Sequence, residues 1–291
     1  MTKSTVLCVG CGYTATGFAD QLRPDGWEIH GTTRSPEKAD ALVAKKINPI
    51  IWNDEKGFAV PGSLNAILIS TPPGAGGCPA LPIIQAALSA ATDKPNWIGY
   101  LSSNGVYGNH DGEWVDETTQ PMPSSVRGQR RLHAENSWLD FGAQSDIPIV
   151  VFRLPGIYGP GRSALDSVRQ GRAKRIFKDG QVFSRAHVAD IVSALVASLA
   201  NPDAGQLFNI ADDEPAPPQD VITYACTLLG VSPPPLVPIE DAALSEMGKS
   251  FYQDNKRVRN DQLKRKLNIS LAYPTYRDGL DAIFAGEKTR T

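Results

Sequence analysis

The chain is poor in cysteine. Its 291 residues include four cysteines, at positions 8, 11, 78 and 226. So sparse a set argues against a small disulfide-stabilised scaffold. Cys8 and Cys11 have the Cys-x-x-Cys spacing of redox and metal sites, but no second pair of ligands lies nearby, which favours structural thiols. We therefore expect no metal site and a protein of the reducing cytoplasm.

Long apolar runs and an excess of one charge are also lacking. No apolar stretch reaches the ~18 residues that a membrane-spanning helix needs, and the N-terminus has no signal-peptide core. The 29 basic and 31 acidic residues give a net charge of −2, which argues against binding of the whole chain to nucleic acid or a membrane surface. A hydrophobic content of 41% is ordinary for a globular protein.

The most informative segment that is present spans residues 6–34. Residues 6–9 predict a buried strand, a helix follows to about Leu22, and residues 27–31 predict a second strand. Between the first strand and the helix, Gly10 permits a tight turn and Gly12 allows close approach of a pyrophosphate, while the small Ala15 allows close packing of helix on strand. The amides at Tyr13 and Thr14 would meet the pyrophosphate at the positive end of the helix. This βαβ unit predicts a dinucleotide site; the alternative is a tight turn in another α/β sheet.

The second strand lacks the acidic residue that an NAD site usually places at its end to accept from the ribose 2′-hydroxyl. Thr33, Arg34 and Ser35 stand there instead, and the next acid is Glu37. A guanidinium binds a 2′-phosphate through two charge-assisted hydrogen bonds. We therefore predict NADP(H) rather than NAD(H). The alternative is that Arg34 is a solvated residue at a strand end.

The rest of the chain alternates strand-like and helix-like segments. Strands are expected at 49–52, 66–70, 97–103, 149–152 and 206–210, and helices at 36–45, 81–91, 127–141 and 186–200. This order predicts an α/β fold, a Rossmann-type doubly wound parallel sheet, which binds ligands at the carboxyl ends of its strands. Residues 1–160 are expected to form the NADP-binding domain, with 183–212 returning to it. Residues 161–182 and 213–291 are expected to form a smaller substrate-binding lobe.

Several motifs resemble those of a known family. Beside the Gly10-x-Gly12-x-x-Ala15 turn, they are Ser102-Ser103-Asn104-Gly105-Val106-Tyr107-Gly108, Val115-Asp116-Glu117, Phe152-Arg153-Leu154-Pro155-Gly156-Ile157-Tyr158-Gly159-Pro160-Gly161, His187-Val188-Ala189-Asp190, Phe208-Asn209-Ile210-Ala211-Asp212-Asp213-Glu214-Pro215 and Tyr276-Arg277-Asp278-Gly279-Leu280. In this order they resemble the extended short-chain dehydrogenase/reductase superfamily, the NAD(P)-dependent epimerase/dehydratase group. With this resemblance, we expect cofactor contacts from Ser70, Thr71, Pro72, Ser102, Arg131, Leu154 and Pro155.

The resemblance breaks at the catalytic pair. The family uses a Tyr-x-x-x-Lys pair and an upstream Ser or Thr. The upstream residue matches at Ser103, but Arg127 stands where the Tyr belongs and Arg131 where the Lys belongs. A guanidinium stays protonated and has no acceptor, so Arg127 cannot be a general base at pH 7. Arg127 can instead hold an oxyanion or a carboxylate, or simply face solvent, and Arg131 can contact the ribose or a phosphate.

Other polar residues are weighed against structural roles. Ser103 is either a hydrogen-bond donor to a substrate oxygen or a cap of its own turn. Tyr107 is a candidate substrate contact, although packing explains it and Tyr158 as well. We expect His187 and Asp190 to cap and pack a helix. Arg185 is the residue best placed in sequence to contact a substrate anion.

Two functions remain open from the sequence. The first is an NADP-dependent oxidoreductase or epimerase that acts on a small polar metabolite, such as a phosphorylated compound or a nucleotide sugar. The second is a non-catalytic NADP(H)-binding sensor or regulator. An intact Ser103 segment favours the first function, and Arg127 with Arg131 favours the second. No nucleic-acid or membrane partner is expected, and a homodimer is left open.

Overall fold

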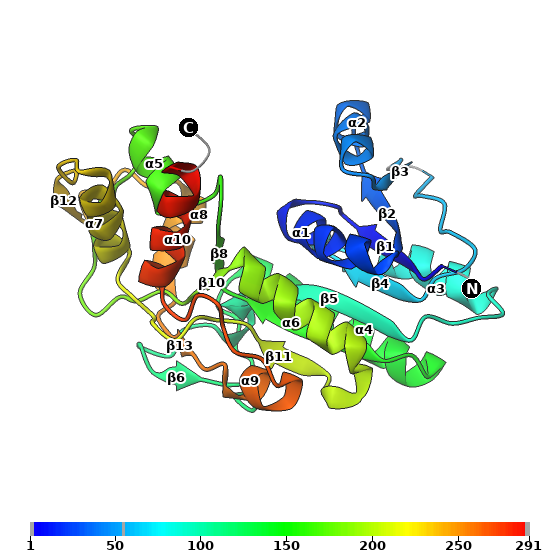
Figure 1. The fold of residues 1–291 in the computed structure, drawn as a ribbon. Coiled ribbons are helices and arrows are strands. Elements are labelled where there is room, and N and C mark those ends of the chain that lie inside the picture. The colour runs from blue at the N-terminus through cyan, green and yellow to red at the C-terminus, as the bar shows by residue number, and fades with distance from the viewer. Residues whose placement is uncertain (1–2, 54–55, 289–291) are drawn as a thin grey trace.

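A seven-stranded parallel sheet forms the centre of the molecule (Figure 1). The computed structural model describes residues 3–53 and 56–288, so the outermost residues of the two expected domain ranges lie outside this description. The strands lie in the order β11-β7-β5-β4-β1-β2-β3. Their bounds are β1 Thr5–Val9, β2 Glu28–Thr33, β3 Asn48–Ile51, β4 Ala66–Ile69, β5 Trp97–Ser103, β7 Ile149–Leu154 and β11 Leu207–Asn209. This confirms the Rossmann-type doubly wound sheet.

Helices cover both faces of this sheet. They are α1 (Tyr13–Leu22), α2 (Pro36–Ala44), α3 (Leu81–Ser89), α4 (Val126–Ser145) and α6 (Val188–Ala200), with short 3-10 turns at η1 (Arg23–Asp25), η2 (Asn104–Tyr107) and η3 (Pro202–Ala204). In β1, Val6 and Cys8 belong to the core under α1 and α6, whereas Leu7 and Val9 belong to the core under α3 and α4. Because alternate side chains of a strand point to opposite faces, β1 needs apolar residues at every position.

A second lobe lies beside the carboxyl edge of the sheet (Figure 1). Its helices are α5 (Ala164–Arg169), α7 (Pro218–Leu229), α8 (Glu246–Gln253) and α10 (Tyr276–Lys288). Three strand pairs accompany them: β8 (Gly156–Tyr158) with β10 (Arg185–His187), β9 (Arg175–Phe177) with β12 (Leu236–Pro238), and β6 (Trp114–Val115) with β13 (Arg257–Val258). Helix α9 (Asp261–Leu267) instead packs against the sheet domain, where Leu263 and Leu267 join the core under α1 and α6. Tyr158, Leu165, Val221 and Leu280 are among the buried side chains of a separate small core, which joins α5, α7 and α10.

One expected helix start was wrong. The amphipathic pattern predicted a helix from residue 186, but Arg185–His187 form strand β10, and α6 begins at Val188. His187 ends the strand as the N-cap of α6, and its Nδ1 accepts from the Ala189 amide at 3.2 Å. Asp190 accepts from the amides of Ala272 and Tyr273 at 2.7 and 3.1 Å. The expected capping and packing roles of His187 and Asp190 are confirmed.

In the part of the chain that is described, no helix combines the length and the apolar character needed to cross a bilayer.

Candidate active site

The turn after β1 depends on glycine at position 10. Gly10 has a φ of +82°, and a Cβ there would lie 3.0 Å from Cγ2 of Thr71. Its amide donates to Oγ1 of Thr32 at 2.7 Å, and the Gly12 amide donates to the Gly10 carbonyl at 2.8 Å. Thr32, near the end of β2, therefore fixes the position of the turn.

The start of α1 fits a diphosphate. Gly12 is the N-cap of α1, and no side chain caps the helix, so the amides of Tyr13, Thr14 and the next residue have no intrahelical acceptor. A Cβ on Gly12 would meet only the Gly10 carbonyl, at 3.9 Å. Across the turn, the hydroxyl of Ser70 is buried without a partner among the described residues. Amides and a hydroxyl that can still donate hydrogen bonds are the groups that bind a phosphate.

The end of β2 presents a positively charged side chain, that of Arg34. Ser35 is the N-cap of α2 and accepts from the Lys38 amide at 3.3 Å, while Oγ1 of Thr33 accepts from the Ser35 amide at 3.5 Å. Arg34 is exposed and has no ion-pair partner among the described residues. Its guanidinium is therefore available for an anion at this corner of the sheet.

The other strand ends place the remaining predicted cofactor residues along the same edge. After β4, Thr71 lies 3.7 Å from the Cys78 sulfur through its hydroxyl, and Pro72 is exposed. At the end of β7, Leu154 is buried beside its pairing partner Ser103, and Pro155 is half-buried. Because all these strands are parallel, their carboxyl ends form one continuous rim.

Ser103 and the two arginines lie where β5 meets α4. The Ser103 hydroxyl accepts from the Gly105 amide at 3.2 Å; it therefore caps the turn but keeps its own proton for a second acceptor. Arg131 is half-buried and donates to the Leu101 carbonyl at 2.7 Å and to the Tyr100 hydroxyl at 3.4 Å. Arg127 is exposed, and its guanidinium carbon lies 5.9 Å from the ring centre of Phe251. No described carboxylate pairs with Arg127, which leaves its charge free.

A buried polar network behind the rim was not found from the sequence. Arg153 forms an ion pair with Glu135 at 2.7 Å, and both side chains are nearly inaccessible to solvent. Ser102 donates to the same carboxylate at 2.5 Å. Its hydroxyl proton therefore serves this network, although Ser102 was expected at the cofactor.

Tyr107 lies on the far side of this network. Its ring centre is 4.7 Å from the Arg153 guanidinium carbon, and its hydroxyl donates to Asn209 at 2.8 Å. Since Tyr107 is 0% exposed, it cannot touch a substrate in this conformation. The structure therefore corrects its expected role as a direct substrate contact: Tyr107 supports the wall behind the site.

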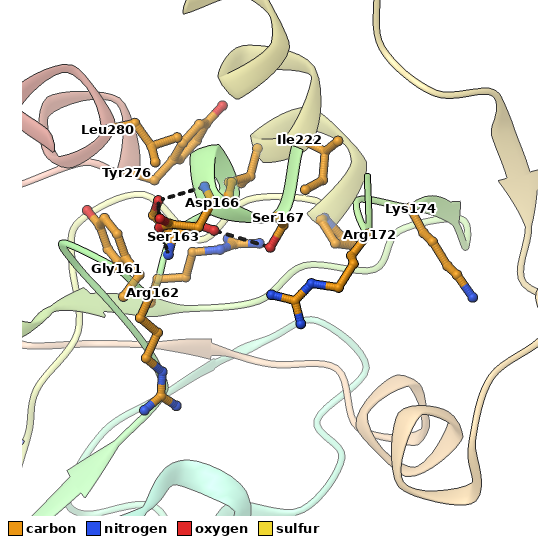
Figure 2. A pocket seen from close by; sticks show the side chains of 15 residues that line it. Gly161, Arg162, Ser163, Asp166, Ser167, Arg172, Lys174, Ile222, Tyr276 and Leu280 are labelled. Atoms are coloured by element: carbon orange, nitrogen blue, oxygen red, sulfur yellow. Dashed lines mark hydrogen bonds between the residues drawn. The ribbon is translucent and has the colours of Figure 1, made fainter. Parts of the chain in front are cut away.

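A basic pocket of about 450 Å³ opens in the second lobe. Figure 2 shows Arg162, Arg172 and Lys174 on the side opposite Tyr276 and Leu280. The apolar part of the lining comes from α7 and α10, and the fourth cation is the predicted anion contact, Arg185. Within α5, Asp166 is occupied by the Ser163 cap through hydrogen bonds at 2.6 and 2.8 Å. The cations therefore outnumber the available acids in this lining.

Tyr13 connects this pocket to the Gly-rich turn. Its hydroxyl donates to the Pro160 carbonyl at 3.0 Å, and the guanidinium carbon of Arg162 lies 5.8 Å from its ring centre. The residue that starts α1 thus contacts the loop that leads into the pocket. A ligand in the pocket and a dinucleotide on α1 would be neighbours.

Two buried titratable groups, Asp212 and His187, lie next to Arg185 of the pocket lining. The backbone of Arg185 is joined to Asp212, whose amide donates to the Arg185 carbonyl at 2.7 Å. Burial raises the pKa of Asp212 to about 8, against the pull of Arg185, and its oxygens have no hydrogen-bond donor in the described structure. Burial also lowers the pKa of His187 to about 4, so His187 is neutral at pH 7. Neither group was expected from the sequence to have an unusual pKa.

Comparison with known proteins agrees with this geometry. The family model "NAD dependent epimerase/dehydratase family" matches residues 80–211. A conserved protein of unknown function from Silicibacter pomeroyi is 45% identical, with a TM-score of 0.89 over 98% of this chain and 100% of that one. Residues 80–211 of this chain are therefore similar to the NAD-dependent epimerase/dehydratase family. The resemblance inferred from the motifs is confirmed.

More distant relatives have named ligands or activities. A dTDP-L-rhamnose 4-epimerase from Burkholderia thailandensis is 32% identical over 112 residues, which is 34% of this chain and 31% of that protein's length. The fold is shared by human SDR39U1, solved with NADPH (17% identity, TM-score 0.76, 97% of this chain and 99% of that chain). It is also shared by a Bacillus cereus UDP-glucuronic acid 4-epimerase, solved with UDP-glucuronic acid and NAD (19% identity, TM-score 0.75, 99% and 100%). These likenesses show a shared fold; NADPH and NAD are the cofactors bound in the two solved relatives.

Proposed function

We propose that this protein is an NADP(H)-dependent oxidoreductase or epimerase of the cytoplasm, acting on a small polar metabolite that carries phosphate or carboxylate groups. A nucleotide sugar is the leading class. We assign cofactor binding to residues 1–160 and 183–212, and substrate binding to residues 161–182 and 213–291. The observation that carries the proposal is the basic pocket, which Tyr13 joins to the Gly-rich turn.

The choice of NADP over NAD rests on Arg34. The residues fit the cofactor because the amides of α1 are uncapped and the Ser70 hydroxyl is unused. At the ribose corner, an exposed arginine stands in the place of an acid. A carboxylate there would repel a 2′-phosphate, whereas a guanidinium forms paired, charge-assisted hydrogen bonds with it.

The pocket supports an anionic substrate with a less polar portion. Arg162, Arg172, Lys174 and Arg185 supply the positive charge, and side chains of α7 and α10 supply the apolar wall. Arginine suits phosphate and carboxylate because its planar donors bind two oxygens at once. A nucleotide sugar has both features: its pyrophosphate is the anionic group, and its base is the less polar portion.

The chemistry would use groups of the cofactor-binding part of the chain. A bound nicotinamide cofactor would supply or accept hydride at the carbon of the substrate. Ser103 can donate its free proton to the substrate oxygen, and Arg127 can stabilise negative charge that develops there. Arg127 cannot accept a proton, because its guanidinium stays charged at neutral pH.

A non-catalytic NADP(H) sensor is the second candidate, and Arg127 is the observation that favours it. The usual general acid–base step contributes about 10²- to 10⁴-fold to a rate, and Arg127 cannot perform it. Such a protein would keep the cofactor crevice and lose hydride transfer.

One experiment separates the two functions. The purified protein is incubated with a metabolite extract and NADPH labelled at the transferable hydrogen of the nicotinamide. We expect the label in a single anionic metabolite, with a heat-treated sample as the control. Tight NADPH binding without transfer of label to any metabolite would contradict the enzyme and support the sensor.

A further inference from the structure

The proton that Arg127 cannot move needs another source, and the chain has eight tyrosines. Five of their hydroxyls are already engaged. Tyr13, Tyr107, Tyr158 and Tyr224 donate to Pro160, Asn209, Thr275 and Asp281, and Tyr100 accepts from Arg131. For Tyr252, Tyr273 and Tyr276, the described structure contains no hydroxyl hydrogen bond. These three phenols are the ones free to act on a substrate.

Tyr252 lies in a segment that is folded against the start of α4. Its neighbour Phe251 packs at 5.9 Å from the Arg127 guanidinium carbon. Just beyond α8, Asp254 accepts from the Ser124 hydroxyl at 2.5 Å, and Lys256 donates to the Gly108 carbonyl at 2.6 Å. The end of α8 is therefore held against the segments on either side of the Ser103 turn and the Arg127 position.

Tyr252 also lies within electrostatic reach of Arg185, one of the cations that line the basic pocket. Its ring packs edge-on against Phe183, with 5.4 Å between ring centres, and Arg185 donates to the Phe183 carbonyl at 2.8 Å. Burial raises the pKa of the Tyr252 phenol, while the Arg185 charge opposes that rise. The phenol is therefore protonated at pH 7 and has a cation close enough to stabilise its conjugate base.

The remaining two free phenols are less suitably placed. Tyr273 packs against the His187 ring, with 4.0 Å between centres, and has no contact with Arg127 among the described residues. Tyr276 is 1% exposed, and in Figure 2 its hydroxyl points away from Arg162 and Arg172. Of the three, only Tyr252 directly follows a residue that contacts Arg127 and also packs against Phe183, whose carbonyl accepts from Arg185.

We propose that Tyr252 replaces the missing family tyrosine as the proton donor to the substrate oxygen. This inference rests on the proposed function. In carbonyl reduction, a bound reduced nicotinamide cofactor would supply hydride to the carbonyl carbon, and Tyr252 would supply its phenol proton to the oxygen. The O–H bond of Tyr252 breaks, an O–H bond forms on the product, and the phenolate recovers a proton from water. In the reverse reaction, the hydride returns to the oxidised cofactor and the proton of the product hydroxyl returns to the Tyr252 phenolate.

The first test compares Tyr252→Phe with Tyr273→Phe in the labelled-NADPH assay. Loss of the donor lowers the rate of label transfer by about 10²- to 10⁴-fold in Tyr252→Phe, with NADPH affinity unchanged. Tyr273→Phe, which removes an equally unbonded hydroxyl, keeps the rate within about 3-fold of the wild type. If wild-type protein transfers label and Tyr252→Phe does so equally well, the assignment is wrong although the enzyme stands. If wild-type protein transfers none, both fail.

The second test reads the phenol directly, without cofactor. Tyrosines labelled at the ζ carbon are titrated by NMR, and Tyr252→Phe assigns the signal. The charged groups around this phenol are Arg185 of β10, Arg127 of α4 through Phe251, Lys178 at the Tyr252 carbonyl, and Asp254. Arg185→Gln should raise the pKa of Tyr252 relative to wild type, and inorganic pyrophosphate should shift its signal. An unchanged titration in Arg185→Gln and no response to pyrophosphate would show that Tyr252 does not lie within reach of the pocket.

Discussion

The cofactor crevice and the basic pocket are constructed differently. In the crevice, backbone amides of one turn face the ligand, and the nearest supports, Thr32 and Ser70, come from adjoining strand ends. In the pocket, side chains form the lining, and they come from β8, from α5 and the loops on either side of it, from β10, and from the distant helices α7 and α10. A backbone site depends on a few glycines, whereas a side-chain site can change specificity without changing the fold.

Two arginines of the molecule also differ, in burial and in partner. Arg153 is 4% exposed and paired with Glu135, so its charge serves the structure. Arg127 is exposed without a carboxylate, so its charge remains available to a ligand. The residue type alone did not distinguish these roles; the partner and the burial did.

Breaking the buried pair should have the largest effect. Glu135→Gln leaves Arg153 charged and uncompensated in the core, and removal of one partner of a buried pair typically costs about 3–5 kcal/mol. We expect a loss of this size in the free energy of unfolding, measured by urea denaturation. Glu246→Gln is the matched control, because its pair with Lys249 is exposed and is expected to contribute at most about 0.5 kcal/mol. Equal, small losses in both variants would refute the structural role of Arg153.

Gly12→Ala tests the backbone site without disturbing the fold. Gly12 has a φ of −101°, and a Cβ there meets nothing closer than 3.9 Å, so stability should change by less than about 0.5 kcal/mol. The methyl group would occupy the approach of the diphosphate, and we expect NADPH affinity to fall about 10- to 100-fold, as measured by calorimetry. Gly62→Ala, in open space, should leave both quantities unchanged. Normal NADPH binding by Gly12→Ala would place the diphosphate elsewhere.

The buried carboxyl of Asp212, beside the basic pocket, should make the stability of the fold depend on pH. Its folded pKa of about 8 lies above the ordinary value of 3.8, so the folded state binds the proton more tightly and loses stability as pH rises through this window. The slope is at most about 1.4 kcal/mol per pH unit. Asp212→Asn should flatten the dependence of Tm on pH between about 4 and 8 and be more stable than wild type at the upper end. An unaltered slope would assign the pH dependence to other groups.

The sequence was sufficient where the signals are local. The glycine turn, the alternating strands and helices, and the Ser35 cap are all contained within a few residues, and the structure has each of them. Even there, the helix start at residue 186 was wrong, because Ala186 pairs with Ile157 of β8, a contact that no local periodicity records.

The sequence was insufficient where side chains meet across the fold. Tyr107 and Asn209 are 102 positions apart, and Asp254 bonds Ser124 over 130 positions. No spacing rule predicts such partners, because the sheet order and the packing of the second lobe determine them. The placement of Tyr252 beside Phe183 belongs to this class and became visible only in the structure.

The most direct test of the account is a calorimetric titration of the wild type and Arg34→Ala with NADPH and with NADH. Hydrogen bonds to charged groups contribute about 1.5–3 kcal/mol. We therefore expect wild type to bind NADPH more tightly, and Arg34→Ala to lose about 10- to 100-fold of NADPH affinity while NADH affinity stays the same. Equal or tighter NADH binding by wild type, unaffected by Arg34→Ala, would contradict the NADP assignment.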